Sequence, residues 1–429
     1  MPKRVLKAIY AKIAANPFLK NVLLISGSTV IGQIIILCFY PIVSRIYSVS
    51  DFGIFQYAQS VISFLIIIAS LRYELAILLP DTDKEAVNIW KLTLIINVLV
   101  FIVLICIIIL IELTGLGSAT VGSLGKYLYI LPFTFLGAAL YQGLVYLNLR
   151  FKNYKVIGKT KIFQAVGNSS AQLLFGVTRS GALGLFVGDL LGRSAGILNL
   201  VSSLSKDIRK NITKLEIKEL KVLAKRYRNF PLFNSPGALL NTAGFALPAL
   251  LFGKIYGLEI LGLYALVDRV YAAPSALIGQ SVSQVFMSEA ASLAKTDTRL
   301  LKQKYIFLLK KLSLMFIIPT IIMVLLGPTL FSLVFGEKWR MAGEFASILA
   351  TMQFAGFVVW PLIPTLLILE KQRIQLIWEG ARVILIMVGF YICYSQNLNV
   401  IHAMIIYGSI MFLFYLLHVV ISIYSLNRT

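Results

Sequence analysis

The sequence predicts an all-α polytopic membrane protein, with about 12 transmembrane helices in two parallel six-helix lobes around a central cavity. Three observations support this fold class. First, 59% of the 429 residues are hydrophobic and only 14% are charged, whereas soluble domains carry about 25% charged residues. Second, the hydrophobic residues form twelve long continuous runs. Third, the two halves of the chain share a short motif at equivalent places.

Each hydrophobic run is long enough to span a bilayer, because about 20 helical residues cross the hydrocarbon core. Membrane strands would instead alternate apolar and polar residues. The fifth run is the most polar, and Gln164, Asn168 and Gln172 lie on one face of it. That face is expected to meet protein or water rather than lipid. The runs lie at residues 21–44, 52–79, 87–111, 124–148, 157–177, 181–204, 231–253, 260–288, 306–335, 343–369, 375–395 and 400–426.

The distribution of lysine and arginine predicts the orientation, because these residues concentrate in cytoplasmic loops. The two alternating sets of loops carry 29 and 6 of them, and both termini belong to the basic set. Lys161 is counted in the basic loop after the fourth run. Both termini are therefore expected in the cytoplasm. The first run is longer than the apolar part of a signal peptide and is expected to remain as a span. The net charge of +22 then follows from topology, so neither nucleic acid nor another polyanion is needed as a partner.

The chain divides into two similar halves around one basic segment. Residues 45–55 and 254–264 align without a gap, with Gly53 opposite Gly262, and each segment follows the first run of its half. Because both halves begin in the cytoplasm, the repeats are expected to be parallel and related by an axis along the membrane normal. The predicted units are an N-terminal lobe at 1–204, a cytoplasmic linker at 205–229 and a C-terminal lobe at 230–429.

Three short patches carry a resemblance to a known family. They read YPIVSRIYSVSDFG at residues 40–53, LRYELAILLP at 71–80, and GLYALVDRVYAAP with GQSVSQ at 262–274 and 279–284. Together they resemble the Wzx-type O-antigen and polysaccharide flippases. This family of polysaccharide biosynthesis transporters belongs to the superfamily that also holds multidrug exporters and lipid II flippases. Members with fourteen spans exist, and this chain lacks the extra pair.

The resemblance implies a flippase of the bacterial inner membrane. Such a protein would move undecaprenyl-diphosphate-linked oligosaccharide from the cytoplasmic to the periplasmic leaflet by alternating access, for O-antigen or related polysaccharides. The implied partners are that lipid-linked oligosaccharide, membrane lipids, and the polysaccharide polymerase with its chain-length regulator. An ion gradient, usually of protons, would drive transport. No covalent step and no cofactor are implied, so the protein is not expected to be an enzyme.

Charged residues inside the hydrophobic runs are the candidate site, because a charge within the bilayer is costly and therefore suggests function. A diphosphate needs fixed cations, and the arginine fork binds phosphate with two hydrogen bonds. Arginines are therefore candidates for binding the diphosphate and sugar, and carboxylates for proton coupling. The candidates are Arg72, Arg193, Arg269 and Arg382 for the substrate, and Glu74, Asp189, Asp268 and Glu379 for the proton.

Spacing separates the stronger candidates from the weaker ones. Arg72 and Glu74 are about 200° apart on a helix, so they are not expected to pair with each other. Asp268 and Arg269 are about 100° apart, so they are expected to point in different directions. Arg72 and Arg269 are the preferred ligands of the diphosphate, in one shared cavity. Glu74 and Asp268 are the preferred carboxylates for coupling.

The two remaining pairs have a structural interpretation as well as a functional one. Asp189 and Arg193 are four residues apart, so each either neutralises the other or serves the substrate. Glu379 and Arg382 are three residues apart near a cytoplasmic helix end, where an arginine can extend its charge to the membrane surface. Neither interpretation is excluded by the sequence.

Two other functions remain open at this point. A multidrug or cation antiporter of the same superfamily would have a similar span count, with a more acidic cavity. A membrane-embedded polysaccharide polymerase or glycosyltransferase would need a large loop with acid or base groups, and the predicted periplasmic loops are short. The sequence has no phosphate-binding glycine loop, no nucleophile set and no metal-ligand spacing, so neither a cofactor nor a metal is predicted.

Overall fold

The computed structural model describes residues 17–114, 124–205, 208 and 216–427, and these residues form helices and contain no strand. In this part of the chain, eleven helical segments are long and apolar enough to cross a membrane. They account for every expected run except the fifth. That run forms α8 (Tyr154–Val177), whose polar stripe lowers its hydropathy, and α8 packs between α2 (Pro17–Ile46) and α9 (Ala182–Ser202). The all-α membrane fold is confirmed, and a full set of twelve spans stays a prediction.

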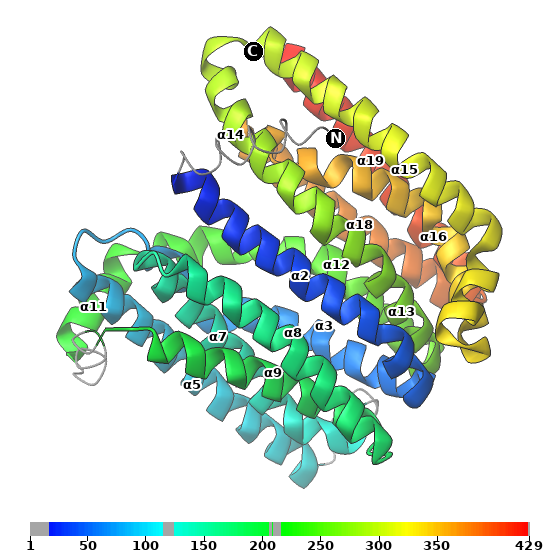
Figure 1. The fold of residues 1–429 in the computed structure, drawn as a ribbon, viewed down its shortest axis with the longest axis horizontal. Coiled ribbons are helices and arrows are strands. Elements are labelled where there is room, and N and C mark those ends of the chain that lie inside the picture. The colour runs from blue at the N-terminus through cyan, green and yellow to red at the C-terminus, as the bar shows by residue number, and fades with distance from the viewer. Residues whose placement is uncertain (1–16, 115–123, 206–207, 209–215, 428–429) are drawn as a thin grey trace, which may run out of the picture.

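Apart from the two helices at the junction between the halves, described below, the helices of the first half pack mainly on one another, and those of the second half do the same. Figure 1 shows the first group in blue to green and the second in green to red, with α2 running between them. The other helices of the first half are α3 (Val49–Ser70), α4 (Tyr73–Ala76), α5 (Asp83–Thr114), η1 (Gly125–Ile130) and α7 (Leu131–Arg150). Those of the second half are η2 (Phe230–Asn234), α12 (Ser235–Tyr256), α13 (Leu258–Pro274), η3 (Ser275–Gly279), α14 (Gln280–Thr296), α15 (Thr298–Phe335), η4 (Glu337–Trp339), α16 (Arg340–Val359), η5 (Trp360–Leu362), α17 (Thr365–Ile368), α18 (Gln372–Ser395) and α19 (Val400–Asn427).

The two halves meet where α3 crosses α13 at a pair of glycines. A Cβ added to Gly53 would lie 1.8 Å from the carbonyl oxygen of Leu258, and one added to Gly262 would lie 1.9 Å from that of Val49. The backbones therefore touch directly, and any side chain would separate them. The contact is reciprocal, because the aligned repeat pairs Val49 with Leu258 just as it pairs Gly53 with Gly262. This arrangement is the one expected of two repeats around a shared axis.

A second contact joins the halves at the same end of the molecule. The Arg45 guanidinium of α2 donates a hydrogen bond to the carbonyl oxygen of Leu333 in the last turn of α15, at 3.2 Å. The Lys338 ammonium of η4 donates in return to the carbonyl oxygen of Tyr47, at 2.6 Å. Each cation thus satisfies carbonyl groups at the other helix's C-terminus, which have no partner within their own helix.

The predicted linker contains a short helix that docks on α5. This helix, α11 (Ile217–Arg226), buries Leu220 and Leu223. The Lys84 ammonium of α5 lies 2.8 Å from a carboxylate oxygen of Glu219 and holds the pKa of that carboxyl below its usual range. The rest of the linker, at 206–207 and 209–215, lies outside the described residues. The boundaries at 204 and 230 stay predictions.

Candidate functional site

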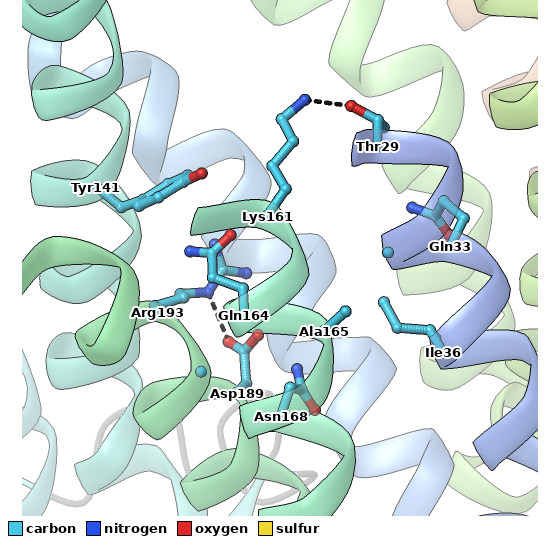
Figure 2. Close-up of a pocket in the computed structure, with 12 residues that line it drawn as sticks. Thr29, Gln33, Ile36, Tyr141, Lys161, Gln164, Ala165, Asn168, Asp189 and Arg193 are labelled. Carbon is cyan, nitrogen blue, oxygen red and sulfur yellow. Dashed lines mark hydrogen bonds and ion pairs between the residues drawn. The ribbon is translucent and has the colours of Figure 1, made fainter. Parts of the chain in front are cut away.

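A cavity of about 300 Å³ lies between α2, α8 and α9, with Tyr141 of α7 at its edge (Figure 2). Its polar lining combines cations with amides. The Lys161 ammonium donates a hydrogen bond to the Thr29 hydroxyl at 2.6 Å, and the Arg193 guanidinium lies 2.9 Å from the Asp189 carboxylate. Three amide side chains also line the cavity: Gln33, Gln164 and Asn168. The predicted polar face of the fifth run therefore meets a cavity, as expected.

A second hollow of about 230 Å³ adjoins the first and brings in the other half of the chain. The two share Asp189 and Arg193, and the second adds Arg269 of α13. The Arg269 guanidinium lies over the ring of Tyr40, 4.9 Å from its centroid, while the Gln59 amide donates to Asp189 at 3.1 Å. The two hollows together form what we call the cationic cavity. Its charged lining consists of three cations and one carboxylate: Lys161, Arg193, Arg269 and Asp189.

Asp268 and Arg269 point in different directions, as their spacing predicts. Arg269 faces the cationic cavity, whereas Asp268 lines a separate pocket of about 160 Å³ within the second half. Six of its thirteen lining residues are aromatic, and we call it the aromatic pocket. Its aromatic side chains are Phe245, Tyr264, Tyr271, Trp360, Tyr407 and Tyr415.

The expected separation of Arg72 from Glu74 is wrong. Leu71 and Arg72 both have positive φ, at 47° and 62°, and end α3 before the predicted end of the second run. This break removes the helical spacing, so the Arg72 guanidinium lies 3.5 Å from the Glu74 carboxylate. Glu74 is buried and also accepts a hydrogen bond from Gln142 at 3.0 Å. Arg72 does not line the cationic cavity, so the structure does not bring it together with Arg269.

Arg382 is buried rather than extended to the membrane surface. Its side chain is among the largest that are fully buried, and its guanidinium lies 4.8 Å from the ring centroids of both Phe245 and Trp378. Aromatic faces attract a cation, so this contact stabilises the charge inside the protein. Glu379 accepts hydrogen bonds from the amides of Asn241 at 3.1 Å and Gln375 at 2.9 Å. The interpretation in which Arg382 extends its charge to the membrane surface is therefore wrong.

Lys161 lines the cationic cavity, although the charge count places it in the basic loop after the fourth run. In the structure it lies inside α8 and faces α2. The signal was present in the sequence, because Lys161 stands three residues before Gln164. It thus begins the same polar stripe that continues to Asn168.

Hydrophilic cavities between two groups of membrane helices are the architecture of secondary transporters, and solved structures share this fold. The lipid II flippase MurJ in its inward closed conformation superposes with a TM-score of 0.71 and 11% identity, over 95% of this chain and 90% of that one. A multidrug resistance MATE family transporter of the MOP superfamily, in its inward-facing conformation, gives a TM-score of 0.67 and 14% identity, over 92% and 96%. At these identities the likeness shows the fold alone.

The sequence comparison identifies the family. The family model described as "Polysaccharide biosynthesis protein" matches residues 42–344, so this chain belongs to that family. A curated relative is the teichuronic acid biosynthesis protein TuaB of Bacillus subtilis (strain 168), with 24% identity over 161 residues. That match spans 38% of this chain and 33% of the relative's length.

Proposed function

We propose that this protein is a flippase for undecaprenyl-diphosphate-linked oligosaccharide repeat units, which it moves from the cytoplasmic to the periplasmic leaflet during O-antigen or related polysaccharide assembly. The observation that carries the proposal is the cationic cavity in a member of a polysaccharide biosynthesis family. A diphosphate leaving the headgroup region loses its hydration and needs cations in exchange. Lys161 and Arg193 of one half and Arg269 of the other supply them from both sides.

Transport would proceed by alternating access between the two halves. In this proposal, one end of the molecule is held closed by the glycine crossing of α3 with α13 and by the hydrogen bonds that Arg45 and Lys338 donate to backbone carbonyls. With both termini in the cytoplasm, this closed end is periplasmic, and the cavity receives substrate from the cytoplasmic side. Rocking about the shared axis would separate the two glycines and release the head group outward. The polyprenyl tail would stay in membrane lipid throughout.

Four carboxylates are the candidates for proton coupling, and their surroundings differ. Asp189 and Glu74 each have an arginine partner, at 2.9 and 3.5 Å. Glu379 accepts hydrogen bonds from two amides, and Asp268 lines a pocket with six aromatic side chains. Proton coupling through any of the four stays a prediction.

The setting follows from the same proposal. The protein would lie in the bacterial inner membrane and deliver repeat units to a polysaccharide polymerase and its chain-length regulator. The protein itself would make and break no covalent bond. A multidrug or cation antiporter is the alternative, and it is less consistent with a cavity that carries three cations and one carboxylate.

Complementation of a deletion strain tests the proposal. Arg193→Ala and Arg269→Ala should each abolish surface polysaccharide at normal protein level, with lipid-linked repeat units accumulating in the membrane. The corresponding lysine variants should keep partial activity, because the charge survives and only the fork is lost. Arg340→Ala is the matched control, since that arginine is exposed and pairs with Glu337 outside the cavity. Full polysaccharide in both alanine variants would contradict the proposal.

A further inference from the structure

The aromatic pocket has the opposite character from the cationic cavity. Its one charged side chain in the described part of the chain is Asp268, and no described residue donates a hydrogen bond to that carboxylate. The residue is only partly buried and lines the pocket. Gln353 and Ser275 add an amide and a hydroxyl to the lining. The pocket thus offers flat ring faces together with a few hydrogen-bonding groups.

Helix α13 separates the two spaces. Its neighbouring residues Arg269 and Asp268 project into the cationic cavity and the aromatic pocket, respectively. A ligand that bridges α13 would therefore meet positive charge at one end and a carboxylate among rings at the other. A diphosphate is attracted by Arg269 and repelled by Asp268. This polarity suits a molecule with an anionic end and an end without negative charge.

The lining chemistry of the aromatic pocket matches a sugar ring. Sites for small molecules combine apolar and aromatic walls with a few placed polar groups. The C–H face of a pyranose can lie against a ring such as Trp360, which is 38% exposed. Ionised Asp268 only accepts hydrogen bonds, and sugar hydroxyls donate them, while the Gln353 amide can do both. A volume of about 160 Å³ is smaller than the roughly 300–1,000 Å³ of complete ligand sites, as expected of one subsite.

We propose that the aromatic pocket is a subsite for a neutral sugar ring of the lipid-linked oligosaccharide, which binds there while the diphosphate lies in the cationic cavity. This inference rests on the proposed function and adds an orientation to it. The first half of the protein holds mainly the diphosphate, and the second half selects the glycan. Sugar specificity then depends on the residues around Asp268 rather than on the arginines.

Binding of two lipid probes to the purified full-length protein in nanodiscs tests the subsite. One probe is undecaprenyl diphosphate, and the other is the same lipid carrying a chain of three N-acetylglucosamines, because one sugar is too short to pass a helix about 10–12 Å thick. The wild type should bind the sugar-bearing probe about tenfold more tightly, which corresponds to about 1.4 kcal/mol. Asp268→Ala and Gln353→Ala should bring that ratio close to one without weakening the binding of the bare lipid. Arg193→Ala should weaken both probes and keep the ratio.

Glu344→Ala is the matched control, because this exposed carboxylate of α16 lies outside the pocket. It should keep the wild-type ratio, and the thermal midpoint of each variant shows whether it is folded. An unchanged ratio in both pocket variants overturns the subsite while the proposed function stands. Failure of the wild type to bind either probe contradicts the proposed function itself. Asp268-dependent binding of tetraphenylphosphonium without any preference for the sugar would make the pocket a cation site and overturn the inference.

Discussion

Replacing Gly262 by alanine should open the end of the molecule that we assign to the periplasm. In the middle of a helix, a change from glycine to alanine ordinarily stabilises the folded protein by up to about 1 kcal/mol. Here the new Cβ would lie 1.9 Å from the carbonyl oxygen of Val49, well short of the 3.4 Å at which ordinary contact begins. Overpacking of this kind costs about 1–3 kcal/mol. Because the closed state alone bears this cost, the equilibrium should shift toward the open state by about 5- to 150-fold.

Labelling of a cysteine in the cavity measures the shift. Gln59 lines the cationic cavity, so Gln59→Cys reports whether reagent reaches it. The native cysteines Cys38, Cys106 and Cys393 are first replaced. A membrane-impermeant maleimide added from the periplasmic side should label the parent slowly and the Gly262→Ala variant several-fold faster. Protection by the closed end is the physical reason for the difference.

Two other glycines provide controls for the loss of glycine itself. Gly237 and Gly380 also lie in helices, but a Cβ at either would meet nothing within 4 Å. Their alanine variants should label like the parent. Equal labelling rates for Gly262→Ala and Gly380→Ala, in proteins of equal thermal stability, would refute the idea that the glycine crossing closes this end.

Three further predictions concern charges. Arg72→Ala leaves buried Glu74 without its cation, so unfolding should become about 3–5 kcal/mol easier; adding Glu74→Gln should restore much of the thermal midpoint, and no loss in the single variant would contradict the pairing. The lowered pKa of Glu219 means that its contact with Lys84 is fully present above the ordinary carboxyl pKa of 4.5 and is lost as the pH falls below it. Acidification should therefore expose α11 to proteolysis, and a pH-independent cleavage rate would refute this. Lys161→Met should slow transport about tenfold, about 1.4 kcal/mol, whereas Lys161→Arg should be milder; equal rates in the two variants would exclude a role for the charge.

The helical membrane fold follows from the sequence because bilayer thickness fixes the length and composition of each span. Continuous apolar runs of that length have few other uses, and hydropathy and length alone predicted all eleven apolar segments of the described residues. The glycine crossing is foreshadowed as well, since Gly53 and Gly262 are aligned in the internal repeat. Their direct contact could not be predicted, because the alignment shows that the two glycines hold equivalent positions in their halves but not how far apart they lie.

The site is less predictable, because it depends on local backbone and on packing between distant segments. The LRYE segment contains neither glycine nor proline, so nothing in it signals the left-handed residues Leu71 and Arg72. That break decides the pairing with Glu74. Likewise, Arg382 is stabilised by rings from two helices, and residues 137 positions apart reveal no contact in a single sequence. The polar stripe of the fifth run predicts that Lys161 lies on a helix. The charge count instead places it in the loop before that helix, whereas α8 already begins at Tyr154.

Reconstitution tests the central claim most directly. Proteoliposomes would contain undecaprenyl diphosphate carrying one N-acetylglucosamine, and a galactosyltransferase added outside would modify only the sugars exposed there. With wild-type protein, the fraction modified should rise from about half toward all of the lipid, because the inner pool becomes accessible. The Arg193→Ala/Arg269→Ala double variant should stay near the value of protein-free liposomes. The same plateau for wild-type, double-variant and protein-free liposomes would contradict the account of this protein as a flippase with a cationic cavity.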